Sequence, residues 1–254
     1  MSTERRGGAQ LVELVHLVFL QVLPSYLPVS DYVVKGGANL RLWFGSRRRS
    51  QDIDLDYLGQ RFDIVEDKVD AVLASHAFRD LLRVAGVEMT EPTKPKQTGT
   101  TRRWKFIVSG PEARSNTKIE FSARGDGDPE RALEAARDDI GRDIGLRVVK
   151  ASHYLAPASI RQKVRALGQR SDTEPRDVFD LDLLFSAHPD VVQPGDIGPR
   201  ELSTAIDAAF GLTFAAYEEL VVTYIEEEFV SIYDRPEVWD DMVLSVTSRL
   251  DALR

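Results

Sequence analysis

The sequence predicts an α/β domain of the α+β type, followed by an all-helical C-terminal domain. A short apolar run at residues 32–35 and a strict alternation of polar and apolar residues from residue 52 indicate strands, as do residues 102–108 and 117–122. Residues typical of turns and loops separate these runs. From about Pro157 the apolar residues recur with helical spacing instead. We therefore predict two domains, residues 1–156 and residues 157–254.

Composition and charge limit the classes of function. The 254 residues include no cysteine, which excludes disulfides, zinc–thiolate sites and thiol nucleophiles and fits a cytoplasmic protein. The net charge of −8 is unusual for a protein that coats nucleic acid, although an enzyme that grips RNA needs only a basic patch. The apolar run 11–23 contains Glu13, His16 and Gln21, so it is too short and too polar to span a bilayer. We predict a core helix there and no membrane partner.

The spacing of apolar residues predicts most elements of the first domain. These are a helix at 9–23, a strand at 32–35, a helical turn at 38–44, a strand from residue 52, an amphipathic helix at 63–85, and strands at 102–108 and 117–122. Residues 91–100 have the composition of a loop. The charged segment 126–143 predicts helix or loop, and residues 147–149 predict a short strand.

The second domain is predicted to contain helices only. Segments 159–167 and 176–185 each have helical spacing, and a longer stretch with the same period runs from 201 to 232. Residues 193–199 predict a loop, and the chain ends with a helix at about 236–250.

Asp52 and Asp54 alternate with Ile53 and Leu55. In a strand this pattern places both carboxylates on one face and both apolar side chains in a core. The rise of a strand separates the two aspartate Cα atoms by about 6.5–7 Å, so both side chains reach one divalent cation or a close pair of them. Hard cations such as Mg²⁺ prefer oxygen ligands and usually bind together with substrate phosphates. For an isolated Asp-x-Asp, the alternative is a solvated strand face.

Gly36 and Gly37 lie upstream of the two aspartates. Without a Cβ, they let the backbone turn tightly and approach a ligand. Backbone amides beside a helix start hold phosphate oxygens. In the intervening basic loop, Arg48 offers a guanidinium for bidentate phosphate contact and Ser50 offers a hydroxyl for a triphosphate oxygen. The alternative for both is an ordinary turn, solvated or capped by the hydroxyl.

Together these residues resemble the signature of the nucleotidyltransferase superfamily related to DNA polymerase β: a glycine-rich turn, a spacer and Asp-x-Asp on a strand. The narrower pattern K-G-G-x-x-L, then R-x-S-x-D-I-D, is similar to that of the AbiEii-type toxin nucleotidyltransferases of bacteria, including their mycobacterial relatives. The resemblance implies a nucleotidyltransferase domain with a mixed sheet. In the superfamily a third carboxylate on a neighbouring strand acts as base. Glu120 in K-I-E-F-S is the candidate, with a solvated strand face as the alternative.

A second motif lies in the helical half of the chain. It resembles the toxin family's K-x-x-A-L-x-x-R followed by R-D-x-x-D-L, and the matching residues are Lys163, Ala166, Leu167, Arg170, Arg176, Asp177, Asp180 and Leu181. The resemblance implies that Lys163 contacts the triphosphate and stabilises the leaving pyrophosphate, and that an aspartate orients a basic residue or touches the nucleotide. The spacer before Arg176 is long, which leaves open whether Asp177 or Asp180 points inward. On spacing alone, these are helix-surface residues.

The resemblance implies a toxin of a toxin–antitoxin system. Such an enzyme uses Mg²⁺, or Mn²⁺ in its place, and transfers a nucleoside monophosphate from an NTP to the 3′ end of tRNA. Extension of that end would block aminoacylation, and a cognate antitoxin would be the protein partner. Two alternatives stay open. One is transfer to an aminoglycoside-like small molecule or a protein side chain, and the other is a catalytically silent relative that only binds.

Overall fold

The computed structural model describes residues 2–123, 129–137, 146–169 and 173–254, with side chains described from Gly7 onwards. The chain divides into two compact units. The first comprises Met1–Gly45 and Arg49–Tyr154, and the second comprises Ser46–Arg48 and Leu155–Arg254. The division near residue 155 comes from the chain's internal contacts. The assignment of residues 1–156 and 157–254 to two separate domains stays a prediction.

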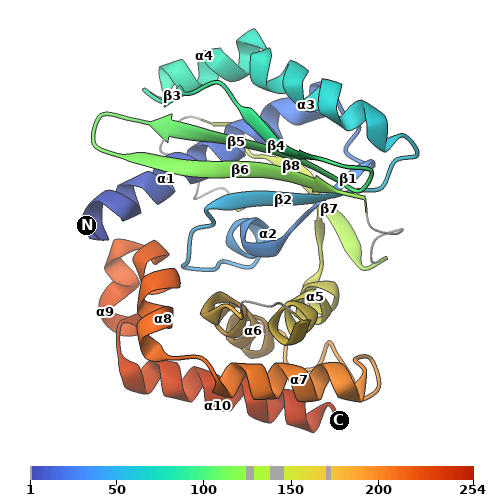
Figure 1. Cartoon of the computed structure of the whole chain (residues 1–254), viewed down its shortest axis with the longest axis vertical. Coiled ribbons are helices and arrows are strands. Elements are labelled where there is room, and N and C mark those ends of the chain that lie inside the picture. Colours follow the sequence, from blue (N-terminus) through green and yellow to red (C-terminus); the bar gives the residue numbers. More distant parts are fainter. Residues whose placement is uncertain (1, 124–128, 138–145, 170–172) are drawn as a thin grey trace. The chain divides into compact units, whose positions relative to one another are not determined.

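The first unit is built on a mixed eight-stranded sheet (Figure 1) with strand order β3-β5-β6-β2-β1-β8-β7, and β4 pairs with β5. The strands are β1 (Tyr32–Lys35), β2 (Asp52–Tyr57), β3 (Glu88–Met89), β4 (Thr93–Gln97), β5 (Thr101–Ser109), β6 (Arg114–Ser122), β7 (Arg131–Ala135) and β8 (Lys150–Tyr154). β2 pairs with β6 in parallel and with β1 in antiparallel orientation. The mixed α/β character predicted for this half of the chain is therefore confirmed.

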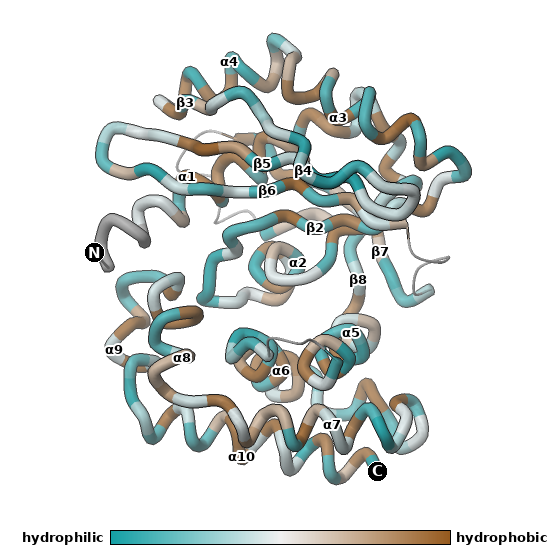
Figure 2. Tube along the Cα trace, in the orientation of Figure 1, coloured by the Kyte–Doolittle hydropathy of each residue, from teal (hydrophilic) through white to brown (hydrophobic). Residues whose placement is uncertain are grey.

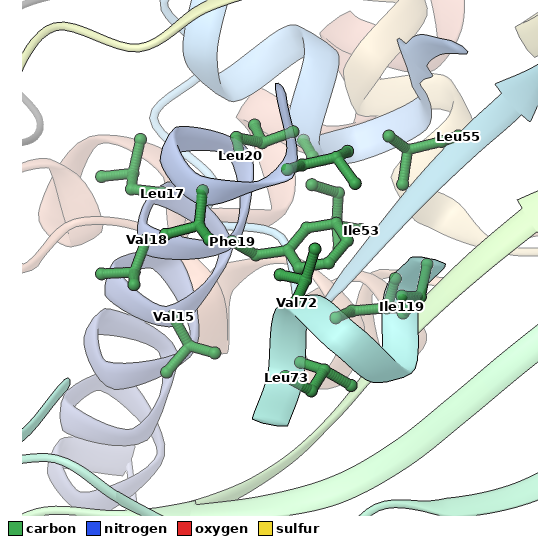
Figure 3. Close-up of a cluster of buried hydrophobic side chains, with 14 of the residues drawn as sticks. Val15, Leu17, Val18, Phe19, Leu20, Ile53, Leu55, Val72, Leu73 and Ile119 are labelled. Atoms are coloured by element: carbon green, nitrogen blue, oxygen red, sulfur yellow. The ribbon is translucent and has the colours of Figure 1, made fainter. Parts of the chain in front are cut away.

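Helix α1 (Ser2–Val22) provides much of the hydrophobic core. It begins seven residues before the predicted start at residue 9. Figure 3 shows its apolar side chains, among them Phe19, packed with Ile53 of β2 and Ile119 of β6. Among the described residues, one stretch, Gly7–Ser25, is long and apolar enough to cross a membrane, and 67% of its most apolar window is buried inside the protein. That burial is typical of a core helix.

The predicted amphipathic helix at 63–85 is in fact two helices, α3 (Val65–Ala74) and α4 (His76–Val84). A short 3₁₀ turn, Phe62–Ile64, precedes them. Ser75 interrupts the helix because its backbone is extended, with φ −68° and ψ 146°, and its side chain accepts a hydrogen bond from Phe78 N. A serine in this geometry starts a new helix rather than continuing the old one.

Three further segments differ from their predicted structure. The predicted loop 91–100 contains β4, an edge strand in which the pairing register shifts between Thr93 and Lys96. Part of the segment 126–143 forms β7, whereas residues 124–128 and 138–145 lie outside the described part of the chain. The strand predicted at 147–149 begins at Lys150 instead, as β8. Figure 2 shows hydrophobic residues along the second half of β5 and hydrophilic ones in the turn that follows.

The elements of the second unit are helices (Figure 1). The long ones are α5 (Ala156–Gln169), α6 (Pro175–Ala187), α7 (Pro199–Phe210) and α10 (Pro236–Ala252). The predicted long helical stretch 201–232 is broken into α7, α8 (Phe214–Leu220), two 3₁₀ turns (Val222–Tyr224 and Glu227–Phe229) and α9 (Val230–Tyr233). Gly211 and Thr213 explain the first break, because the glycine ends α7 and the threonine hydroxyl caps α8.

Candidate nucleotidyltransferase site

Asp52 and Asp54 begin β2, the strand that lies between β1 and β6. Their side chains are 28% and 32% exposed, whereas Ile53 and Leu55 are fully buried. The alternation of strand side chains therefore places the carboxylates on the polar face of the sheet, as the sequence predicted. The parallel pairing with β6 sets Asp52 beside Lys118 and Asp54 beside Glu120.

Lys118 bridges the two aspartates. Its Nζ lies 3.3 Å from Asp52 Oδ2 and 3.2 Å from Asp54 Oδ1, and its side chain is 23% exposed. Burial opposes the charged form of this amine, but the carboxylates of Asp54, Asp52 and Glu120 outweigh it and raise its pKa. The lysine is therefore a cation. Its positive charge lies between the two carboxylates and offsets the repulsion between them.

Glu120, the predicted third carboxylate, is paired with an arginine. Arg103 lies directly opposite it on β5. The Nε of Arg103 donates to Glu120 Oε2 at 2.6 Å, and its Nη2 lies 2.5 Å from the same oxygen. One row across the sheet thus runs from Asp54 through Glu120 to Arg103. It contains two neighbouring carboxylates and ends with a guanidinium.

The glycine pair opens helix α2 (Gly36–Trp43) directly after β1, so Gly36 and Gly37 belong to the helix rather than to a separate turn. Gly36 has φ +67°, a conformation that L side chains rarely adopt, and a Cβ there would lie 3.5 Å from Asp54 Oδ2. The helix N-terminus thus begins close to one of the carboxylates. The Ser50 hydroxyl donates to the backbone carbonyl of Asp52 at 2.8 Å, which fixes the turn into β2.

A buried cluster of four charges forms in the second unit. Lys163 on α5 lies 2.9 Å from Asp177 Oδ1 and 2.5 Å from Asp180 Oδ2, and both aspartates are fully buried on α6. Arg48 is only 5% exposed and donates through Nη2 to both carboxylate oxygens of Asp180, at 3.2 and 3.1 Å. Both aspartates therefore point inward. Arg170, the remaining basic residue of the motif's first half, lies outside the described residues.

The pKa values of Lys163 and Asp180 are both shifted toward the charged forms of these groups. Burial alone would favour neutral forms. For Lys163, Asp177 and Asp180 outweigh burial and raise its pKa. For Asp180, Arg48 and Lys163 outweigh burial and lower its pKa. Such a buried network tolerates the loss of one partner poorly, because the remaining charge is then buried without compensation.

Each arginine of the basic loop has a carboxylate partner. Arg47 lies 3.5 Å from Glu226 and its guanidinium stacks over the Phe229 ring, 4.1 Å from the centroid. Arg49 lies 3.2 Å from Glu13, and Arg48 binds Asp180 as described above. The loop is thus held by ion pairs and is not a solvated turn.

The donor set at β2 fits a divalent cation. Two carboxylates already hold one cationic group, the Lys118 ammonium, between them. Among the described residues, no group of three or more His, Cys, Asp or Glu side chains is arranged to hold a metal. Two carboxylates suffice for Mg²⁺, which commonly completes its coordination with substrate phosphates and water.

Sequence reasoning missed two groups at this site, Lys118 and Arg103. Both lie in strands that the sequence predicted, but their importance follows from the pairing of β2 with β6 and of β6 with β5. Because strand alternation already placed Lys118 on the Glu120 face, the correct strand order would have shown that this lysine lies beside Asp52.

Comparisons with known proteins agree with this geometry. The family model described as the nucleotidyl transferase AbiEii toxin of type IV toxin–antitoxin systems matches residues 19–241. The fold is similar to that of JHP933 from Helicobacter pylori, with TM-score 0.60, 16% identity and 96% and 91% of the two chains covered. It is also similar to a second H. pylori protein described as a candidate nucleotidyltransferase, with TM-score 0.56, 16% identity and coverages of 94% and 91%.

At 16% identity, these structures establish the fold alone. No protein with a curated description matches the sequence. The family match, by contrast, spans most of the chain and includes both the Asp52–Asp54 pair and the Lys163 motif. The chain belongs to the AbiEii nucleotidyl transferase toxin family of type IV toxin–antitoxin systems.

Proposed function

We propose that this protein is a toxin that transfers a nucleoside monophosphate from an NTP to the 3′ end of tRNA and so blocks translation. The observation that carries the proposal is the pair of carboxylates, Asp52 and Asp54, on one face of β2 with a cationic group between them. In the reaction, the terminal hydroxyl oxygen of the acceptor bonds to the α-phosphorus. The bond from that phosphorus to the bridging oxygen of the β-phosphate breaks, and pyrophosphate leaves.

Asp52 and Asp54 would hold Mg²⁺, or Mn²⁺, together with the triphosphate. The bound cation would polarise the α-phosphate and neutralise charge on the attacking and leaving oxygens. Asp54 lies beside the N-terminus of α2, where Gly36 leaves the backbone open to a close approach. Backbone amides of Gly36 and Gly37 at such a helix start suit phosphate oxygens. Ser50, whose hydroxyl fixes the turn into β2, acts by positioning Asp52.

Lys163 is the proposed triphosphate ligand of the helical unit. An ammonium group has three N–H donors. Asp177 and Asp180 take two of them and thereby orient the third. Both aspartates are therefore positioning residues in this proposal, and Arg48 holds Asp180 in place. A lysine fixed in this way stabilises the charge that develops on the leaving pyrophosphate.

Glu120 is the proposed base for the acceptor hydroxyl. It sits beside Asp54 on the neighbouring strand, as that role requires. The ion pair with Arg103 fixes the position of the Glu120 carboxylate. A carboxylate carries two oxygens with several lone pairs, so Oε1 can accept the proton while Oε2 stays bound to Arg103.

The biological setting follows from the family. Membership of a type IV toxin–antitoxin system implies a cognate antitoxin. Because NTPs and tRNA are cytoplasmic reactants, we place the protein in the cytoplasm.

The proposal is tested by incubating the protein with Mg²⁺, total tRNA and each of the four NTPs in turn, labelled at the α-phosphate. Label on RNA, lost in the Asp52→Ala variant, is the expected result. Label that appears only on protein or on an added small molecule such as an aminoglycoside would point to a different acceptor. Absence of transfer, with NTP binding retained, would identify a silent relative. An Asp52→Ala variant with full activity would remove Asp52 from the site.

A further inference from the structure

A groove of about 550 Å³ opens beside the carboxylate pair, within the first unit. Its lining includes Asp52 and Lys118, and it continues over β5 and β6 to Lys105, Asn116 and Thr93. The groove thus starts at the proposed metal site and leads away from it across β6 and β5.

Strand register explains the charges of the groove. Asp52, Lys118, Lys105 and Thr93 are successive partners on the four neighbouring strands β2, β6, β5 and β4. At about 4.8 Å per strand, Lys105 lies about 10 Å from Asp52 across the sheet. Asp52 therefore marks the acidic end of this row, and Lys118 and Lys105 mark its middle.

Two lysines face each other across β5 and β6, an arrangement that destabilises a sheet. Lys118 is compensated by Asp52 and Asp54, but Lys105 is exposed, and none of the described carboxylates pairs with it. A cation in that position, two strands away from the proposed metal site, suits an anionic ligand that extends out of that site.

We propose that this groove binds the phosphodiester backbone of the acceptor RNA strand through Lys105 and Lys118. Lys118 is held by Asp52 and Asp54 until a divalent cation takes its place, and it then turns to the RNA. Binding of the cation also neutralises Asp52, which leaves Glu91 as the acidic residue of the groove lining. The terminal hydroxyl of the RNA thereby lies at Asp52, and the phosphates of the RNA lie along Lys118 and Lys105. This inference rests on the proposed function, because it takes the acceptor to be RNA.

RNA affinity tests the groove without any chemical step. The probe is a single-stranded RNA 12-mer, titrated with Mg²⁺ but without NTP at several salt concentrations. Lys105→Met should weaken binding several-fold and reduce the slope of log K against log salt by about 0.7, the value for one lost phosphate contact on a single strand. The KM for NTP should not change.

Lys150→Met is the matched control, because it removes one exposed lysine from β8, on the other side of β2 in the strand order. Its RNA affinity should equal that of the wild type. Equal affinities for the Lys105 and Lys150 variants would overturn the proposal. A Lys105→Met variant with a raised KM for NTP and unchanged RNA affinity would also overturn the proposal, because it would show that the groove binds the nucleotide. A wild type that transfers no nucleotide to RNA but binds the 12-mer through Lys105 would instead count against the proposed reaction alone.

Cation binding tests the exchange at Lys118. Without RNA or NTP, Lys118→Met should bind Mn²⁺ several-fold more tightly than the wild type in a paramagnetic resonance titration, because no ammonium competes for the carboxylates. The gain in RNA affinity that Mg²⁺ gives the wild type should shrink in this variant. Weaker Mn²⁺ binding by Lys118→Met would show that the lysine supports the cation site, which would overturn the exchange.

Discussion

At the scale of single residues, two pairs of aspartates are each held close together by a lysine. Asp52 and Asp54 sit next to each other on one face, and the structure compensates them with Lys118. Asp177 and Asp180 are compensated by Lys163 in the same way. The first pair is partly exposed and suits an exchangeable cation, whereas the second is fully buried and suits a permanent one. This contrast separates a site whose cation can exchange from a lysine that two buried aspartates hold in place.

Substitution of Asp52 or Asp54 by Asn should remove activity without unfolding the protein. Each change removes one anionic ligand of the proposed cation but preserves the size of the side chain. We expect transfer rates to fall at least 100-fold, the usual effect of losing one preorganised electrostatic group. Both side chains are partly exposed, so thermal unfolding followed by circular dichroism should change little. Activity of Asp54→Asn within tenfold of the wild type would contradict the assignment.

Removal of Lys163 should destabilise the protein. In Lys163→Met, Asp177 and Asp180 stay buried with one fewer cation, and breaking a buried pair in this way costs about 3–5 kcal/mol. Urea unfolding at neutral pH measures the loss. Arg165→Met, which removes an exposed cation from the same helix, is the control and should stay within about 0.5 kcal/mol of the wild type.

The buried cluster also predicts a pH dependence. The pKa of Asp180 is lowered in the folded protein, so its contribution to stability is complete above the ordinary value of 3.8 and is lost as the pH falls through the lower folded value. The pKa of Lys163 is raised, so its contribution is complete below 10.5 and is lost as the pH rises beyond that value. Unfolding of Asp180→Asn should lack the acid-side loss that is due to this group.

The sequence identified the site's residues but not their partners. Alternation was enough to place Asp52 and Asp54 on one face, because that property is local to a strand. The partners Lys118 and Arg103 depend on which strands are neighbours, which local spacing does not determine. Likewise, Lys163 and Asp180 read as helix-surface residues by spacing, and their burial depends on the packing of α5 against α6.

At the scale of elements, a buried histidine links α1 to β6 and, through β6, to the start of β2. His16 Nε2 lies 2.9 Å from Thr117 Oγ1, and Thr117 donates its hydroxyl hydrogen to the carbonyl of Gln51 at 2.7 Å. Since that hydroxyl donates elsewhere, it accepts from His16. The residue that precedes Asp52 is thereby linked through β6 to the core helix.

His16 should make stability fall in mild acid. Burial lowers its pKa from 6.5 to about 3. Between these values the unfolded chain binds a proton that the folded chain does not, so stability falls as the pH drops from 6.5 towards 3. The slope that this group adds is at most about 1.4 kcal/mol per pH unit. Urea unfolding of His16→Gln at several pH values should lack it, and an unchanged slope would contradict the assignment.

The break between α3 and α4 gives a second test at this scale. Ser75→Ala removes the side chain that caps α4, which should cost about 1 kcal/mol in the free energy of unfolding. Ser75→Asp keeps a capping oxygen and should retain most of the stability in the same urea titration. Equal losses in both variants would mean that the cap contributes little.

The sequence predicted an element well where a local pattern of residues determines it. It predicted an element poorly where pairing with another strand or a single capping residue determines it. β1 appears at its predicted position because it is a short apolar run, and β2 because its polar and apolar residues alternate strictly. Residues 91–100 were predicted as a loop from their composition. They contain β4 because an edge strand with an irregular register tolerates a proline such as Pro95. Helix 63–85 was predicted as continuous because the helical spacing of apolar residues persists across Ser75. That spacing does not show the break, because one residue, the capping serine, causes it.

At the scale of the whole molecule, two motifs that are far apart in the sequence belong to one proposed reaction. Residues 46–48 belong to the helical unit by their contacts, although Arg48 precedes Asp52 by only four residues. The chain thus passes directly from the buried cluster of Lys163 to the strand that carries the carboxylates. The family match covers both motifs.

The mass of tRNA after incubation tests the central claim most directly. Purified tRNA is treated with the protein, Mg²⁺ and the NTP that gives the strongest labelling, and its intact mass is measured together with released pyrophosphate. We predict a gain of one or more nucleoside monophosphates per tRNA, one pyrophosphate for each, and neither product with Asp52→Asn. A tRNA of unchanged mass would contradict the account, as would an equal gain with the Asp52→Asn variant.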